Sequence, residues 1–108
     1  MNVRVSEIAR HEAAAVARWH DDQPARLGTE FLDAFEATLR EIEASPYLHG
    51  VAGDSRLDHE DREIFIARFR QRVIYTIVGD EAWVLAVVHS SRKPGIWHLQ
   101  ANHEQRNR

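Results

Sequence analysis

Apolar residues recur along this chain with two periods, a helical one in the first half and a strand-like one in the second. Asn2–Val5 is predicted to form a short strand, because Val3 and Val5 would lie on one face. The alanine-rich run over residues 7–20 predicts a helix, which Ser6 is suited to cap. Its apolar stripe carries small side chains that would let a second helix approach closely: Ala9, Ala13, Val16 and Ala17.

A second helix has the clearest helical period in the chain. Residues 21–24 break the first helix, and Pro24 suits a first-turn position of the next one. Ser45 and Pro46 are predicted to end this second helix. The residues of its apolar stripe are Leu27, Phe31, Phe35, Leu39 and Ile42. Two helices joined by a short break form a helical hairpin.

Strands are predicted for the rest of the chain, after an aperiodic loop over residues 47–61. Residues 63–69, 72–78 and 83–89 have strand character, with tight turns at 70–71 and 79–81. The third of these runs is apolar on both faces, which is typical of a central strand. The predicted fold is therefore α+β with the order β-α-α-β-β-β, a helical hairpin packed on a small antiparallel sheet. Residues 1–100 would form the one domain, and residues 101–108 a polar tail.

Composition is that of an ordinary soluble domain, with 44% hydrophobic and 29% charged residues in a chain of 108. The absence of cysteine excludes a disulfide scaffold and thiol chemistry. We find neither a signal peptide nor a run long enough to span a membrane, so the expected location is the cytoplasm.

Charge is distributed unevenly beneath a net value of −3. Residues 1–61 carry 6 basic and 13 acidic side chains, whereas residues 62–108 carry 8 basic and 4 acidic ones. An acidic helical half and a basic sheet half suggest two faces with different partners, although uneven charge is also common in small proteins.

Most cofactor and catalytic motifs are missing from the sequence. No phosphate-binding glycine loop occurs, and the seven histidines form no zinc-binding pair, so neither a cofactor nor a metal is expected. Ser90 and Ser91 lack the surroundings of a hydrolase nucleophile. His89 ends the most apolar strand, where a structural role is favoured over proton transfer. Four other histidines are predicted to be solvated: His11, His20, His49 and His59.

Basic residues near the sheet are the stronger candidates for a binding patch. Two strands and the turn after a third would bring together Arg68, Arg70, Arg72, Arg92 and Lys93. On strand spacing, Arg68 would point to the face opposite Phe69. Such a patch could bind phosphates or an acidic protein, or it could simply protect the sheet from aggregation.

The tryptophans are predicted to serve mainly in packing. Trp97 follows a Pro-Gly turn that would fold the tail over the sheet, where its indole would close the core or form a contact surface. Trp19 and Trp83 are predicted to be core or half-buried residues.

Residues 2–97 resemble the RelE/ParE toxin superfamily, the plasmid stabilisation proteins of type II toxin–antitoxin modules, and most of all its ParE branch. The features that carry the resemblance occur in a matching order: Ser6-Glu7-Ile8-Ala9, Leu27-Gly28-x-x-Phe31, Ser45-Pro46, Arg62, Tyr75 and His89-x-x-Arg92-x-x-x-x-Trp97. The resemblance implies a toxin neutralised by a cognate antitoxin, whose C-terminal segment would occupy a groove between helices and sheet. It also allows a higher-order toxin–antitoxin assembly.

The two branches of this superfamily act on different targets. ParE-like members inhibit DNA gyrase without catalysis, whereas RelE-like members cleave mRNA on the ribosome with basic residues and a C-terminal tyrosine or histidine. Trp97 occupies the late position here and offers no usable proton, and Lys93 is the only lysine. The resemblance therefore favours a non-enzymatic gyrase inhibitor, with a target-binding patch of Arg68, Arg70, Arg72, His89, Arg92, Lys93 and Trp97. An endoribonuclease and a diverged, non-toxic antitoxin-binding domain are the alternatives.

Overall fold

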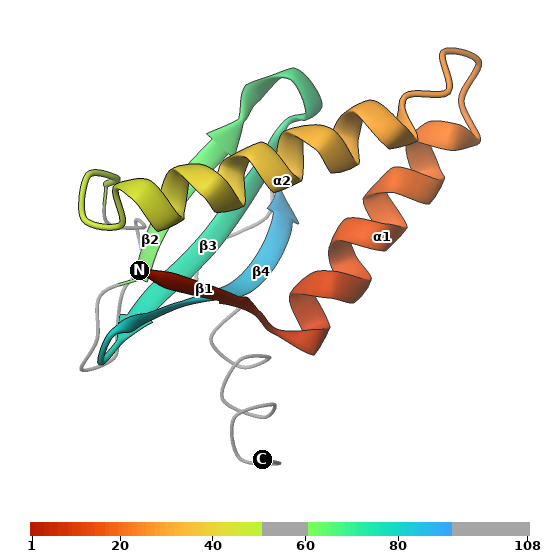
Figure 1. Ribbon diagram of the computed structural model, residues 1–108. Coiled ribbons are helices and arrows are strands. Elements are labelled where there is room, and N and C mark those ends of the chain that lie inside the picture. Colours follow the sequence, from red (N-terminus) through yellow and green to blue (C-terminus); the bar gives the residue numbers. More distant parts are fainter. Residues whose placement is uncertain (51–60, 92–108) are drawn as a thin grey trace.

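Two helices lie against one face of a four-stranded sheet (Figure 1). This computed structural model describes residues 1–50 and 61–91. Its elements are β1 (Asn2–Val5), α1 (Glu7–Asp21), α2 (Gly28–Ala44), β2 (Asp61–Ile66), β3 (Gln71–Val78) and β4 (Glu81–His89), with a 3₁₀ turn, Ala67–Phe69, after β2. The predicted α+β fold and its β-α-α-β-β-β order are confirmed.

The strands are ordered β1-β4-β3-β2 across the sheet. β4 is central, as its apolar sequence predicts, and pairs antiparallel with β3. β1 runs parallel to β4, with Val3 opposite Ala82, so the sheet is mixed rather than wholly antiparallel. Both helices lie between these two strands in the chain, and a crossover of that length is what a parallel pair requires.

Ser6 joins the start of α1 to β4. Its hydroxyl accepts the backbone N–H of Ala9 at 3.0 Å, which confirms the predicted N-cap. The same hydroxyl donates to the carbonyl of Leu85 at 3.2 Å, and the backbone N–H of Ser6 donates to the Val84 carbonyl at 2.9 Å. This residue therefore fixes the direction in which α1 leaves the sheet.

The core lies between the hairpin and the sheet. Ala9, Ala13 and Ala17 are buried on α1, as their spacing predicts. α2 contributes large side chains to the same cluster, Phe31, Phe35 and Ile42. The sheet residues beneath them include Val73, Tyr75, Val84 and Val87. Small residues on one helix and aromatic ones on the other pack together in this layer.

The link between the helices differs from the prediction, because Pro24 lies in the turn and α2 begins only at Gly28. The carboxylate of Asp21 accepts the backbone N–H of Gly28 at 3.0 Å. A Cβ on Gly28 would collide with that carboxylate. The glycine therefore allows the last residue of α1 to cap the first turn of α2.

The strand predicted over residues 63–69 ends earlier, at Ile66. Residues 67–69 turn in a 3₁₀ helix, which Arg70 ends in a left-handed conformation with φ of 56°. This turn places Phe69 in the core, with its ring 5.4 Å from that of Phe31. Neither glycine nor proline marks the position, so the sequence offers no turn signal there.

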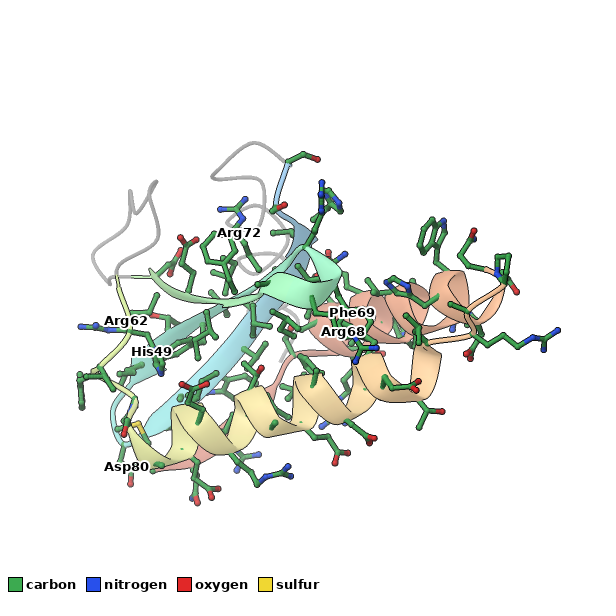
Figure 2. The ribbon with its side chains drawn as sticks, turned by 90° about the horizontal axis from the view of Figure 1, so that it is seen from above. His49, Arg62, Arg68, Phe69, Arg72 and Asp80 are labelled. Atoms are coloured by element: carbon green, nitrogen blue, oxygen red, sulfur yellow. The ribbon has the colours of Figure 1, made fainter. Side chains whose placement is uncertain are left out.

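The start of the predicted loop is held against the sheet. The phenol of Tyr75 donates to the Pro46 carbonyl at 2.6 Å, and burial raises the pKa of this phenol. Arg62 donates to the carbonyls of Tyr47 and His49, at 3.2 and 2.6 Å (Figure 2). His49 is half-buried beside Tyr75, so the prediction of a solvated histidine is wrong at this position. No helix among the described residues is long and apolar enough to cross a membrane.

Candidate functional site: a basic pocket at the end of the sheet

Three of the predicted patch residues, Arg68, Arg70 and His89, line one pocket of about 430 Å³. The other residues around it are Val16, Trp19, His20, Phe69 and Gln71. We call this cavity the basic pocket. It lies where the end of α1 meets the turn between β2 and β3 and the end of β4.

Backbone pairing brings these segments together. Gln71 opens β3 opposite His89, the last residue of β4. One residue before Gln71, the Arg70 carbonyl accepts the backbone N–H of Ser90 at 2.8 Å. The left-handed conformation of Arg70 turns the chain from the 3₁₀ helix into β3 at this point. The strand register therefore places Arg70 and His89 at the same rim.

Aromatic rings form the inner wall of the basic pocket. The His20 ring lies 5.0 Å from that of Phe69 and 4.9 Å from that of Trp19. The predictions for these two α1 residues are both wrong: His20 is half-buried, and Trp19, expected to be a core or half-buried residue, is 59% exposed. His20 follows Val16 by four residues and Ala17 by three, so the helical period of the buried stripe was a signal for its position.

Two arginines supply the charge of the pocket. Arg68 and Arg70 are both exposed. The guanidinium carbon of Arg68 lies 5.0 Å from the centroid of the Phe69 ring, whereas strand spacing had placed these side chains on opposite faces. The 3₁₀ turn removes that alternation and allows a cation–π contact. Among the described residues that line the pocket, none is acidic.

Arg72 does not belong to the basic pocket, and its predicted place on an exposed rim is wrong. It pairs with Phe65 across the strands and lies on the sheet face away from the helices, whereas Arg68 lies on the helix side (Figure 2). Its side chain is buried and donates to the Glu63 carboxylate at 3.3 Å. A buried, paired arginine of this kind is part of the structure of the sheet.

His89 is exposed at the end of β4, bonded to the turn that follows it. The backbone N–H of Ser91 donates to Nδ1 at 3.1 Å, and the Ser91 hydroxyl lies 2.8 Å from the same atom. A neutral ring that accepts at Nδ1 carries its proton on Nε2. The other predicted patch residues, Arg92, Lys93 and Trp97, lie outside the described residues, as do the tail over 101–108 and His59.

The chemistry available in the basic pocket is anion binding and hydrogen bonding. Two guanidinium groups offer fixed positive charge, and the imidazoles of His20 and His89 offer ring nitrogens as hydrogen-bonding groups. In the part of the chain that the structure describes, no three histidine or acidic side chains gather in a way that could hold a metal ion.

A second cavity, of about 560 Å³, opens between α1 and α2. We call it the interhelical groove. Its floor is made mainly of alanine, leucine and phenylalanine, and Leu32 is 41% exposed there. Charged residues of both helices complete its lining, namely Arg10, Arg18, Asp21 and Glu36. An apolar floor with charges of both signs suits an amphipathic segment of another chain.

Comparison with known proteins gives a match of fold rather than of sequence. The chain matches no protein-family model and no curated protein. Its structure is similar to a solved chain described as "Chromosomal ParDE TA system from P. aeruginosa", with a TM-score of 0.59 and 13% sequence identity. The match covers 82% of this chain and 95% of that one. The protein therefore has the fold of a chain from a ParDE toxin–antitoxin structure.

Proposed function

We propose that this protein is the toxin component of a type II toxin–antitoxin module. The observation that carries the proposal is the fold likeness to a chain of a ParDE system over 82% of this chain. The sequence features that resemble the ParE branch support the same assignment. Among them, Gly28 and Ser6 have specific structural roles here, as the contact point of the two helices and as the cap that joins α1 to β4.

The partner in this proposal is a cognate antitoxin, and the interhelical groove is its docking surface. The groove is apolar and flanked by charges, as an amphipathic helix would require. Alanines on α1 keep the groove open, because they bury backbone without filling the space above it. The module would act in the cytoplasm, and paired toxins and antitoxins could form a larger assembly.

The favoured target is DNA gyrase, inhibited without catalysis. The supporting feature is the exposed cationic rim that Arg68 and Arg70 form beside Trp19. In the proposal this rim contacts gyrase in its complex with cleaved DNA, and the sequence candidates Arg92, Lys93 and Trp97 stay predictions for the same role. A rim that lacks acidic side chains among its described residues suits a surface next to DNA.

A supercoiling assay tests the target directly. Purified protein is expected to inhibit gyrase and to increase cleaved DNA, and premixing with the antitoxin should abolish both effects. An Arg68→Gln/Arg70→Gln variant is expected to lose inhibition. The matched control is Arg40→Gln, which removes one charge from an exposed position on α2. Full supercoiling at several-fold molar excess of the wild-type protein would rule out gyrase as the target.

An endoribonuclease of the RelE type is the second candidate. The observation that favours it is the pair of imidazoles, His20 and His89, in a cavity with two arginines. Primer extension on mRNA after induction would then show cuts at codons in the ribosomal A site, and these cuts would disappear in a His89→Ala variant. Growth inhibition with intact mRNA excludes this candidate.

A diverged protein that only binds its antitoxin is the third candidate. Expression without the antitoxin separates it from the other two, since they predict arrested growth and this one predicts normal colonies. Normal colonies at verified expression would overturn toxicity while leaving antitoxin binding to be measured separately.

A further inference from the structure

We infer that the basic pocket is a binding site for a single unstacked nucleotide, with the base on the aromatic wall and the phosphate at the arginines. The inference goes beyond the proposed toxin function and does not depend on it, because it concerns binding by the isolated protein. It rests on three observations: the size and lining of the cavity, the exposure of Trp19, and the absence of acidic groups among its described lining residues.

The first step concerns size and polarity. A volume of about 430 Å³ lies within the range of small-molecule sites, and the wall is largely apolar. A ligand that fills this cavity needs a flat or compact apolar part. Phe69 is almost fully buried and gives the cavity a rigid floor, because it is packed against Phe31 and His20.

The second step concerns Trp19. Its indole is 59% exposed at the edge of the cavity, although large aromatic side chains are normally covered in a folded protein. The T-shaped contact with the His20 ring, at 4.9 Å, restrains the indole from one side and leaves other surface available. An exposed, restrained indole is a stacking platform for a nucleobase, since every base offers a π face.

The third step concerns charge. Arg68 and Arg70 stand at the rim, and Arg68 is held over Phe69. Guanidinium groups bind phosphate in a bidentate manner. The nearest acidic residue of α1, Asp21, directs its carboxylate to the backbone N–H of Gly28 instead. The combination of a stacking surface and cations favours a nucleotide over an acidic peptide, which would gain little from the indole.

The same chemistry could come from RNA, from single-stranded DNA or from a free nucleotide, and the test separates these sources. The full chain is titrated, in a fluorescence anisotropy assay, into labelled eight-nucleotide single strands of RNA and of DNA. A hairpin duplex of equal charge serves as a probe whose bases are already stacked. A 5′-mononucleotide is added as a competitor. We expect at least one of the two single strands, RNA or DNA, to bind several-fold more tightly than the duplex.

Substitutions in the basic pocket and a control outside it test which side chains bind the nucleotide. Trp19→Ala is expected to weaken single-strand binding by at least about fivefold, with rescue by Trp19→Phe. Arg68→Gln/Arg70→Gln is expected to weaken single-strand binding by at least about tenfold. It should also reduce the slope of log affinity against log salt concentration, by up to the contribution of about two phosphate contacts. Arg40→Gln, on α2, should leave it unchanged, and thermal melting checks that every variant is folded.

The inference is overturned if single strands and duplex bind equally, if Trp19→Ala binds like the wild type, or if Arg40→Gln weakens binding as much as the pocket variants do. It is also overturned if no probe binds at millimolar concentration, or if an acidic peptide binds the pocket more tightly than every nucleotide probe. Failure of this inference is distinguishable from failure of the proposed function, because gyrase inhibition and antitoxin binding are measured in separate assays with different partners.

Discussion

One phenol links the middle of the sheet to the start of the loop after α2. Tyr75 is fully buried in β3, and its hydroxyl reaches the Pro46 carbonyl directly behind the end of α2. Arg62 on β2 donates to the carbonyls of Tyr47 and His49, in the same loop. The resemblance includes both residues, and the structure gives each of them a stabilising role.

Replacing Tyr75 by Phe should therefore lower the free energy of unfolding by about 1–2 kcal/mol, because the Pro46 carbonyl loses its donor. Burial raises the pKa of the phenol in the folded protein, so above about pH 10 the unfolded chain releases this proton first. The stability of the wild type should fall as pH rises through that range, and the fall should be smaller in Tyr75→Phe. Urea unfolding from pH 8 to 11 measures how the free energy of unfolding changes with pH in the wild type and in Tyr75→Phe. Tyr47→Phe is the control, because Tyr47 is exposed.

Gly28 and Asp21 form a pair whose effects should be strongly coupled. Gly28→Ala in the wild type is expected to lower stability by about 1 kcal/mol, because the new Cβ displaces the carboxylate that caps α2. In an Asp21→Ala background the obstacle is gone, and the same change should raise stability by a few tenths to about 1 kcal/mol through helix propensity. A double-mutant cycle by chemical denaturation measures the change of sign. Equal effects in both backgrounds would contradict the clash.

Among the elements, β4 is longer than β1, the strand that pairs with it on one side. β1 covers only positions 81–84, and the register of β3 and β4 shifts at Ile74 and Tyr75, which leaves Leu85 as an extra residue. From this bulge onward, the N-cap of α1 and one of its side chains occupy the place of the missing strand. Ser6 donates to the Leu85 carbonyl, and Glu12 accepts the backbone N–H of Val87 at 2.9 Å.

Glu12→Ala should consequently leave a buried backbone donor without its acceptor and lower stability by about 1–3 kcal/mol. Glu12→Gln keeps an acceptor oxygen and should lose less. Hydrogen exchange followed by NMR gives a local readout, since the Val87 amide should exchange faster in Glu12→Ala than in the wild type. The control is Glu36→Ala, at an exposed position. If the Val87 amide exchanges at the wild-type rate in Glu12→Ala, and Glu36→Ala lowers the free energy of unfolding equally, Glu12 does not have this role.

Element order was predictable because each element has its own period and its own end signal. The stripe from Leu27 to Ile42 and the stop at Ser45 define the body and the end of α2, whereas its start, at Gly28, lies later than the predicted first turn at Pro24. The turn after Ile66 was not predictable, since it depends on burial of Phe69 against α2 rather than on a local turn residue. The parallel direction of β1 was equally hidden, because four residues with an alternating pattern fit either direction.

The site was predictable only in part, for a related reason. Arg70 and His89 meet through strand register, which sequence order already suggests. Trp19 and His20 join them because of the angle at which α1 crosses the sheet, and that angle depends on the bonds of Ser6 and Glu12 to β4. The prediction for Arg72 was wrong because this residue is buried on the other face of the sheet, where it bonds to Glu63.

At the scale of the whole molecule, the basic pocket and the interhelical groove lie on different surfaces. The basic pocket is formed by α1 and the ends of the sheet, whereas the interhelical groove is formed by α1, α2 and Val5. Among the residues that the structure describes, none lines both. Under the proposed function, a toxin with this arrangement would contact its antitoxin and its target through separate groups, so neutralisation would require an obstruction or a change in shape rather than shared contacts.

Leu32→Arg tests this separation. A charge on the exposed apolar side of the groove should weaken antitoxin binding at least about tenfold, while toxicity in the absence of the antitoxin stays intact. Co-expression then arrests growth that the wild-type pair tolerates, and calorimetry measures the affinity. Leu48→Arg is the control, because Leu48 is 78% exposed and lies outside the groove. Normal neutralisation of Leu32→Arg would place the antitoxin elsewhere.

Parallel pairing of β1 with β4 also has a consequence for biosynthesis. β1 has no partner in the sheet until residues 81–84 have been translated. At 5–20 residues per second, that delay is roughly 4–16 s. The native sheet topology is therefore completed only after β4 has been translated, and β1 stays unpaired throughout that interval.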